Sequence, residues 1–202
     1  DTLLLDEEIV NVEVWTYDEP RLYTIQEMQL NNDKKKSFKT VFHFKDQKLI
    51  QIGSNEYPNS ILTDDANDDY ALVYSTEPYQ LSSQWTGQFS KNDLAIVNVN
   101  NGLSKLAIKG NPSPASLSPN GEYAYGYNQV DSTWYTYNTK TSKYTELTNG
   151  KMFYNELSDY PNYPRSYGTA GWTKNDKSIL IYDRYDIWEF NPETGINKRL
   201  TK

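Results

Sequence analysis

The chain has 202 residues and carries 27 acidic against 20 basic side chains, which gives a formal net charge of −7. No stretch gathers the basic residues that a phosphate backbone requires, so nucleic acid is excluded as a partner, and the absence of cysteine excludes disulfides and thiolate chemistry. The 18 Tyr and 5 Trp supply large contact areas in a chain that is only 37% hydrophobic, and this bias favours strands over helices.

The ends of the chain carry no targeting signal that we recognise. No apolar run approaches the roughly 18 residues that a membrane helix needs, so no membrane span is expected. The start, residues 1–5, lacks the basic and apolar regions of a signal peptide. Since the chain begins and ends abruptly on strand-like sequence, we expect a mature or shortened form of a longer protein.

The first segment, residues 11–53, predicts four strands without a clear turn motif. Strand-like stretches cover residues 12–17, 22–30, 38–44 and 48–52. Between the second and third of them, Lys34-Lys35-Lys36 follows Asn31-Asn32-Asp33 and is typical of a solvated hairpin loop. We interpret this segment as a divergent four-stranded unit.

A repeated turn begins further along the chain. Asn67-Asp68-Asp69-Tyr70, Asn120-Gly121-Glu122-Tyr123 and Asn175-Asp176-Lys177-Ser178 recur at spacings of 53 and 55 residues. Asn, Asp and Gly tolerate the backbone angles of tight hairpins, and a short strand-like run ending in tyrosine follows each turn. A fixed period of this length indicates a repeat architecture.

A second turn completes each repeat. Asn98, Asn138 and Asn191 each open a polar turn that a further strand follows. Each repeat is therefore expected to form four antiparallel strands, which is the structure of one β-propeller blade. The sequence predicts an all-β fold of about four such sheets, an incomplete propeller over residues 1–202, with approximate blades 11–53, 54–110, 111–150 and 151–202.

Two segments depart from the repeat. The second blade carries an insertion around residues 77–91, which includes Trp85. The stretch 154–171 is rich in proline and tyrosine, and because proline cannot donate to a strand ladder, we expect a loop on one face of the propeller there.

These elements carry a resemblance to a known family. The matching segments are residues 12–15, 117–123, 167–173, 175–176, 182–188, 191–192 and 200–201. They are similar to the propeller of bacterial prolyl oligopeptidase-like (dipeptidyl aminopeptidase-like) serine peptidases, and the Ser-Pro-Asn-Gly element at 118–121 is shared with TolB-like propellers. The segment from Gly171-Trp172-Thr173 to Asp186-Ile187-Trp188 is the most specific part of the match.

The resemblance implies a role without catalysis. In that family an α/β-hydrolase domain carries the Ser, Asp and His of the catalytic triad, and no Gly-x-Ser-x-Gly nucleophile elbow occurs in this sequence. The propeller of the family acts as a lid that restricts access to short peptides and can hold the substrate's amino terminus. The resemblance also implies a bacterial protein in the periplasm or outside the cell. No catalytic residue and no cofactor is expected.

Two sites are weighed first against structural roles. His43, the only histidine, lies in Phe42-His43-Phe44 and is interpreted as an ordinary strand residue. The acidic cluster at 64–69 offers oxygen ligands of the kind that calcium prefers, but it occupies a repeated turn and lacks the ligand order of an EF-hand, so no metal site is expected.

The remaining candidates concern binding. Arg184, beside Asp183 and Asp186, either bridges carboxylates between blades or clamps a substrate carboxylate. Glu156 and Asp159 either stay hydrated on the proline-rich loop or pair with a peptide's ammonium group. The aromatic residues Tyr79, Trp85 and Phe89 of the insertion either pack on its base or contact a partner.

Three hypotheses of function follow. The first is a non-catalytic segment of a prolyl oligopeptidase-like peptidase that gates peptide access and docks the hydrolase domain. The alternative is a free-standing TolB-like envelope propeller that binds protein partners. A glycan-processing propeller is disfavoured, since 27 acidic residues form some carboxylate pairs by chance. Because an open arc of blades exposes sheet edges, we also expect an edge-to-edge homodimer or an imperfectly curled arc.

Overall fold

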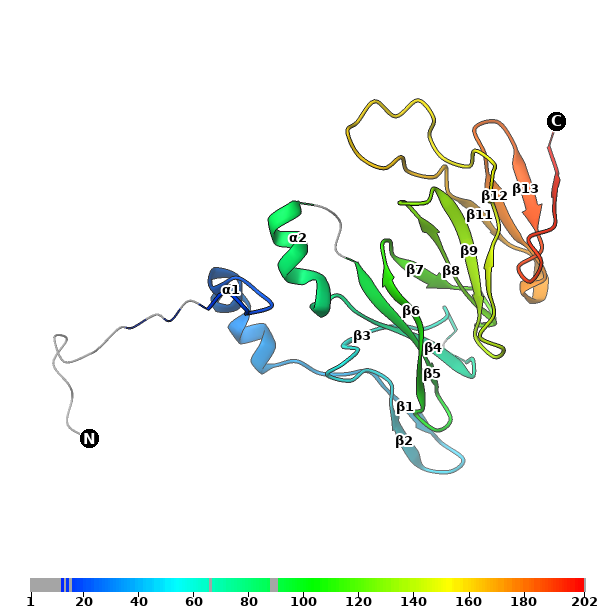
Figure 1. Cartoon of the computed structure of the whole chain (residues 1–202). Helices are drawn as coiled ribbons and strands as arrows, with labels where there is room; N and C mark the ends of the chain where they lie inside the picture. The colour runs from blue at the N-terminus through cyan, green and yellow to red at the C-terminus, as the bar shows by residue number, and fades with distance from the viewer. Residues whose placement is uncertain (1–11, 13, 15, 66, 88–90, 202) are drawn as a thin grey trace, which may run out of the picture. The chain divides into compact units, whose positions relative to one another are not determined.

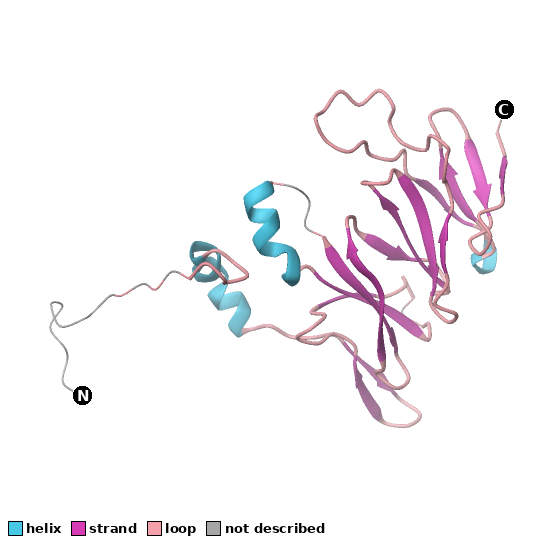
Figure 2. Ribbon diagram, in the orientation of Figure 1, coloured by secondary structure: helices cyan, strands magenta, loops and turns pink. Residues whose placement is uncertain are grey.

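The computed structural model describes residues 12, 14, 16–65, 67–87 and 91–201. The chain divides into two compact units, Asp1–Lys36 and Ser37–Lys202. Figure 1 shows the chain coloured from the N-terminus to the C-terminus, and Figure 2 shows that the second unit consists mainly of strands and the loops between them. No helix among the described residues is long and apolar enough to cross a membrane.

The first unit contains a helix where a strand was expected. Helix α1 spans Tyr23–Lys34, so the prediction of a strand over 22–30 is wrong. The segment Gln26-Glu27-Met28-Gln29-Leu30 consists of strong helix formers, and its local propensity decides the structure because no residue of the helix is buried. Arg21, which precedes the helix, forms a 2.7 Å ion pair with Asp33 in the last turn. In the strand expected over 12–17, the described residues 12, 14, 16 and 17 lie in no strand, and residues 13 and 15 lie outside the described part.

The second unit begins with a two-stranded sheet. Strands β1 (Thr40–His43) and β2 (Lys48–Gln51) pair antiparallel, and they confirm the strands expected over 38–44 and 48–52. The divergent unit at the start of the chain therefore forms two strands in place of four. We call β1–β2 the first sheet.

Three four-stranded antiparallel sheets follow, each with its strands paired in chain order. The second sheet consists of β3 (Asn59–Ile61), β4 (Tyr70–Ser75), β5 (Asn92–Asn98) and β6 (Ser104–Asn111). The third consists of β7 (Ala115–Leu117), β8 (Tyr123–Asn128), β9 (Thr133–Asn138) and β10 (Tyr144–Glu146). The fourth consists of β11 (Thr169–Trp172), β12 (Ile179–Tyr182), β13 (Ile187–Phe190) and β14 (Asn197–Arg199). The all-β class and the incomplete propeller are confirmed.

The second repeated turn has the same hydrogen bonds in each four-stranded sheet. The backbone N–H groups of Asn98, Asn138 and Asn191 donate to the carbonyl five residues later at 2.9, 2.9 and 2.8 Å. Each asparagine Oδ1 also accepts a backbone N–H two residues on, at 2.9, 3.0 and 2.9 Å. An asparagine side chain that satisfies its own turn is a local device, and this is why the turns can be read from the sequence.

The insertion in the second sheet is helical. Between β4 and β5 the chain forms a short 3-10 helix, η2 (Glu77–Tyr79), and helix α2 (Gln80–Thr86), which ends at Gly87 with a φ of 65°. A second 3-10 turn, η3 (Lys174–Asp176), lies between β11 and β12. Asp176 itself has a φ of 50°, in the left-handed region.

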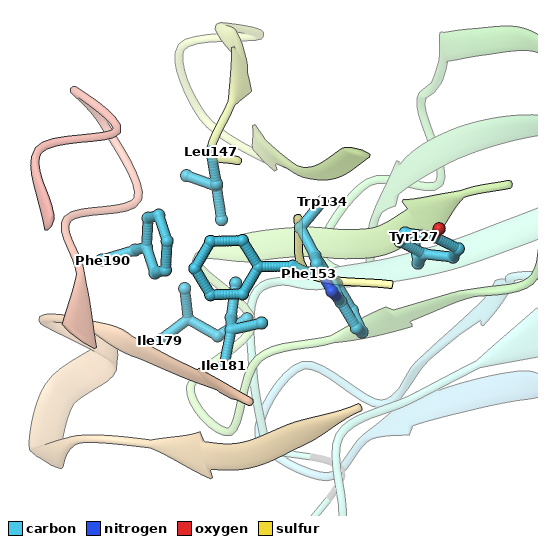
Figure 3. Packing of buried hydrophobic residues seen from close by; sticks show 7 residues of the cluster. All are labelled: Tyr127, Trp134, Leu147, Phe153, Ile179, Ile181 and Phe190. Carbon is cyan, nitrogen blue, oxygen red and sulfur yellow. The ribbon is translucent and has the colours of Figure 1, made fainter. Parts of the chain in front are cut away.

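Apolar clusters join each sheet of the second unit to the next. Ile52 and Val99, with Ala71 and Val97, fill the space between the first and second sheets. Leu72, Leu94 and Ile96 of the second sheet pack against Ala115, Ala124 and Tyr137 of the third. Figure 3 shows the third cluster, in which Tyr127, Trp134 and Leu147 meet Phe153, Ile179, Ile181 and Phe190.

Polar side chains also join the third and fourth sheets. The Asp176 carboxylate, 1% exposed, accepts a 2.5 Å hydrogen bond from the Ser118 hydroxyl of the third sheet's first turn. Glu193 of the fourth sheet accepts the Tyr123 hydroxyl at 3.0 Å and the Asn138 amide at 2.5 Å. Side chains that close a turn thus also fix how one sheet stacks on the next.

Candidate functional site

A pocket of the second unit lies between the third and fourth sheets. Its volume is about 550 Å³, within the range of small-molecule sites. The link between β6 and β7 forms one wall with Pro112, Ser113 and Pro114, and β8 contributes Tyr125, Gly126 and Tyr127. The opposite wall is Arg165, Ser166 and Gly168, at the base of the proline-rich loop.

The proline-rich loop holds this wall in place. Tyr154 and Ser166 form an isolated antiparallel bridge, and the Asn155 N–H donates to the Arg165 carbonyl at 2.8 Å. The Tyr127 hydroxyl donates to the Pro164 carbonyl at 3.1 Å. Figure 1 shows the segment between β10 and β11 as a long yellow loop that leaves the sheets and returns. The loop is therefore closed at its base, next to the pocket.

Two donors without a partner among the described residues border the pocket, one exposed and one buried. The guanidinium of Arg165 makes no hydrogen bond or ion pair with any described residue, and Arg165 is exposed. The indole Nε1 of Trp134 is buried and finds no acceptor among the described residues. Buried donors are nearly always paired in folded proteins, so an acceptor oxygen from a ligand or a water molecule fits here.

The pocket lining has a distinctive charge composition. Arg165 is the only charged side chain among the described lining residues, and these contain no Asp, Glu or His. A free guanidinium beside aromatic walls suits a carboxylate attached to an apolar group, because the guanidinium fork donates two parallel hydrogen bonds to a carboxylate.

Gly126 of β8 lines the pocket and is closely packed against its neighbours. A Cβ atom built at this position would lie 2.7 Å from the Tyr135 hydroxyl oxygen and 3.1 Å from the Pro114 carbonyl oxygen. Tyr135 is 1% exposed and donates to the Asn111 side chain at 3.2 Å, so its ring cannot move aside easily. Only glycine therefore fits at this position of β8 without moving its neighbours.

The structure brings two of the predicted binding residues together. Arg184 Nη1 lies 3.2 Å from Glu156 Oε1, and the guanidinium also lies over the Tyr185 ring at 5.1 Å. The pKa of the Glu156 carboxyl is lowered by its own backbone N–H, by the Tyr167 hydroxyl at 2.9 Å and by Arg184. Asp159 is exposed further along the loop and makes no hydrogen bond with any described side chain. Arg184 is thus paired with a loop carboxylate, and none of the three lines the pocket.

Asp183 accepts hydrogen bonds that close the turn between β12 and β13. Its Oδ1 accepts the N–H groups of Tyr185 and Asp186 at 2.8 and 2.6 Å, and its Oδ2 accepts the Trp188 indole N–H at 2.7 Å. Burial acts to raise the pKa of Asp183, but these donors prevail and lower it. Asp186 pairs with Arg199 at 3.2 Å, so both carboxylates are satisfied within their own sheet.

The aromatic residues of the insertion separate into two environments. The Tyr79 hydroxyl donates to Asp93 at 2.6 Å, and burial and this carboxylate raise the pKa of Tyr79 to about 12. Trp85 on α2 is 77% exposed. Phe89 lies outside the described residues. Tyr79 therefore packs on the base of the insertion, while Trp85 is open to a partner.

His43 and the acidic cluster have local partners. His43 Nε2 lies 2.8 Å from the Val99 carbonyl oxygen, a contact that joins the first and second sheets. Asp65 accepts hydrogen bonds from Thr63 and Asn67, and Asp69 accepts one from Asn100. Among the described residues, no group of three or more His, Asp or Glu side chains could hold a metal ion.

The pocket residues were not singled out by the sequence. Pro112, Tyr125, Trp134 and Arg165 come from four separate segments, and only the stacking of two sheets brings them together. The proline-rich loop was the one available signal, because Arg165 immediately follows its last proline.

Comparisons with known proteins place the fold. No protein-family model matches the chain, and no curated protein matches its sequence. Among solved structures, an oligogalacturonate lyase in complex with manganese aligns with a TM-score of 0.52 and 11% identity, covering 82% of this chain and 48% of the lyase.

Two other solved structures align more loosely. A TolB from Agrobacterium tumefaciens has a TM-score of 0.42 and 13% identity, over 77% of this chain and 51% of its own. Dipeptidyl peptidase 4 from Porphyromonas gingivalis has a TM-score of 0.42 and 10% identity, over 83% of this chain and 31% of its own. At these identities the likeness concerns the fold alone.

The sheets and the first of these alignments define the class. This chain is a β-propeller protein, and its described residues form an incomplete propeller. It spans about half the length of the lyase whose fold it shares.

Proposed function

We propose that this chain is a non-catalytic propeller segment that binds peptides in the pocket between the third and fourth sheets. In the complete protein, a prolyl oligopeptidase-like peptidase, it gates peptide access and docks the hydrolase domain. The observation that carries the proposal is the pocket lining, in which Arg165 has no partner among the described residues, lies beside aromatic residues and is accompanied by no Asp, Glu or His. The family resemblance also supports a periplasmic or secreted location.

The ligand is expected to bind through its carboxyl terminus. Arg165 supplies the fork for a carboxylate, the buried Trp134 Nε1 lacks an acceptor, and Tyr125 and Tyr127 offer apolar ring surface. A short peptide with a free carboxylate and an apolar last residue satisfies all three groups.

The test is a titration with paired peptides. A tripeptide ending in Pro-Phe with a free carboxylate is compared with its carboxamide, and binding is followed by tryptophan fluorescence and by amide NMR shifts. We expect the free acid to bind about tenfold more tightly, since a charge-assisted hydrogen bond is worth roughly 1.5 kcal/mol or more. Arg165→Gln removes this preference.

Arg184→Gln is the matched control. Arg184 is also an arginine of the fourth blade region, but Glu156 already pairs with it, so we expect this variant to bind the free acid as the wild type does. If Arg184→Gln and not Arg165→Gln weakens binding, the substrate clamp expected from the sequence replaces the pocket. Equal binding of acid and carboxamide refutes the carboxylate site.

The parent protein is tested separately. A Gly-x-Ser-x-Gly elbow followed by Asp and His in the coding sequence downstream of Lys202 supports the peptidase assignment. Its absence there favours the second candidate, a TolB-like propeller that binds protein partners, for which the exposed Trp85 on α2 is the supporting observation.

A further inference from the structure

Another pocket lies between the second and third sheets, on the opposite face of the third sheet from the pocket that contains Arg165. Strand β7 shows this arrangement, because successive side chains of a strand point to opposite faces. Ala115 lines the new pocket, and Ser116 lines the Arg165 pocket. Pro112 and Pro114, in the link between β6 and β7, line both. We call the new one the apolar pocket.

The two pockets occupy equivalent places in the repeat. Tyr74 of β4 pairs with Leu94 of β5, and Tyr127 of β8 pairs with Trp134 of β9. The first pair lines the apolar pocket and the second lines the Arg165 pocket. The fold thus places a pocket at the same position between successive sheets, and the residues that differ between the two pockets determine what each can hold.

The apolar pocket suits an uncharged ligand. Its described lining contains no charged side chain, and the only polar side chains are Thr76 and Asn92. The others are Ile61, Tyr74, Leu94, Ala115 and the two prolines. An ion would lose its hydration here without gaining a partner of opposite charge. The volume is about 200 Å³. Since an apolar cavity of about 150 Å³ can hold benzene, this pocket has room for one ring with a small substituent.

Asn92 supplies an acceptor without a partner. Its side chain is buried, with 6% of its surface exposed, and its Nδ2 donates to the carbonyl oxygens of Asn111 and Ser113 at 3.2 and 3.3 Å. These two contacts fix the orientation of the amide, because only its nitrogen can donate. The Oδ1 is buried and accepts no hydrogen bond from any described residue. Buried acceptors are nearly always paired, so the hydroxyl or N–H group of a ligand fits here.

We propose that the apolar pocket binds a small uncharged aromatic molecule that carries one hydroxyl or N–H group. The ring lies against Leu94 and Ala115, and its hydroxyl or N–H group donates to Asn92 Oδ1. This site is separate from the Arg165 pocket and does not rest on the peptide binding proposed there. Phenol is the probe, because it is a single ring with a single donor.

The first experiment is a titration of the chain with phenol, anisole and benzoate, followed through the amide NMR shifts of β5. Phenol is expected to give saturable shifts and to bind about fivefold more tightly than anisole, which has no donor; one neutral hydrogen bond supplies about this ratio. Benzoate carries a charge, and we expect it to bind at least about tenfold more weakly than phenol at β5. Nuclear Overhauser effects between the phenol ring and the methyl groups of Ile61 and Leu94 locate the ligand.

Three results overturn the proposal. The absence of saturable phenol shifts in β5 excludes the site. Anisole that binds as tightly as phenol shows that Asn92 Oδ1 is not the acceptor. Benzoate that binds at β5 as tightly as phenol contradicts the selection against charge.

Substitutions at two adjacent residues of β7 separate the two pockets. Ala115→Leu fills the apolar pocket and is expected to weaken phenol binding at least about tenfold, while the tripeptide still binds in the Arg165 pocket. Ser116→Leu is the matched control and should leave the phenol affinity within about twofold of the wild type. The opposite pattern contradicts the proposal. Urea unfolding shows whether each variant folds, and if Ala115→Leu does not, the Overhauser effects in the wild type decide. Failure of the tripeptide to bind leaves the phenol result unchanged.

Discussion

The carboxylate of Asp176 is the most informative place to perturb the stacking of the third and fourth sheets. It lies in η3 and accepts hydrogen bonds from three donors of the third sheet's first turn: the Ser118 hydroxyl at 2.5 Å, the Asn120 N–H at 3.1 Å and the Glu122 N–H at 3.4 Å. Ser118 is fully buried and also accepts the Tyr123 N–H at 2.9 Å. The substitution Asp176→Ala leaves all three donors without this acceptor.

The expected loss of stability is large. A net hydrogen bond to a charged group contributes roughly 1.5 to 3 kcal/mol, and the short Ser118 bond belongs to this class. The two backbone bonds are longer, and we assign about 1 kcal/mol to both together. Asp176→Ala therefore lowers the free energy of unfolding by about 2.5 to 4 kcal/mol. Asp176→Asn keeps the shape and one acceptor oxygen, so its loss is smaller, about 1 to 2 kcal/mol.

Urea unfolding followed by tryptophan fluorescence measures this loss. With a denaturant slope of roughly 2 to 3 kcal/mol per molar, Asp176→Ala lowers the midpoint by more than about 1 M. Asp68→Ala is the matched control, because Asp68 holds the same position in the first repeated turn but its buried Oδ2 has no hydrogen-bond partner. A double-mutant cycle with Ser118→Ala should give a coupling of about 1 to 2 kcal/mol. Equal midpoints for the Asp176 and Asp68 variants would falsify the assignment.

Three further predictions test the packing. Gly126→Ala places a methyl group against the Tyr135 hydroxyl and is expected to cost about 1 to 3 kcal/mol of unfolding free energy in the same urea assay; an unchanged midpoint contradicts the close contact. Burial and Glu193 raise the pKa of Tyr123 to about 12 from its ordinary value of 10.0. The folded state therefore holds this proton more tightly than the unfolded state. The contribution of the Tyr123 hydroxyl to the unfolding free energy is complete below pH 10 and declines as the pH rises towards 12. This pH-dependent contribution is reduced in Tyr123→Phe, and unfolding at stepped alkaline pH measures it. Trp85→Ser should change stability by less than about 0.5 kcal/mol, because that ring is mostly in solvent, and a larger change measured by urea would show that the ring packs.

The repeated turns made the fold of the second unit predictable from the sequence. The first unit was not predicted correctly. Asn98, Asn138 and Asn191 satisfy their own turns through their side chains, so the local sequence determines the local structure. Residues 22–30 were expected to form a strand, yet the chain forms helix α1 over Tyr23–Lys34, and no residue of the helix is buried. Helix propensity decides the structure there, and an alternation of apolar residues does not reveal whether a partner strand exists.

The sequence indicated the loop and the charged residues near the candidate site, but not the residues that line the pocket. The proline-rich loop and the Glu156 and Arg184 charges could be found in the sequence because each is a local anomaly. The pocket depends on Pro114, Gly126, Trp134 and Arg165, which are ordinary residues in their own segments. These residues come together because two sheets stack on each other. Contacts between stacked sheets could not be predicted from the single sequence.

In the described part of the chain, each apolar cluster joins two neighbouring sheets, and this governs how the protein unfolds. His43 links the first sheet to the second, and Asp176 and Glu193 link the fourth to the third. Under such nearest-neighbour coupling, the free energy accumulates unit by unit, and the end units open first. The two short strands beside His43 should exchange their amide hydrogens well before β8 and β9 do. The same coupling lets a gene gain or lose one repeat while the remaining ones keep their packing.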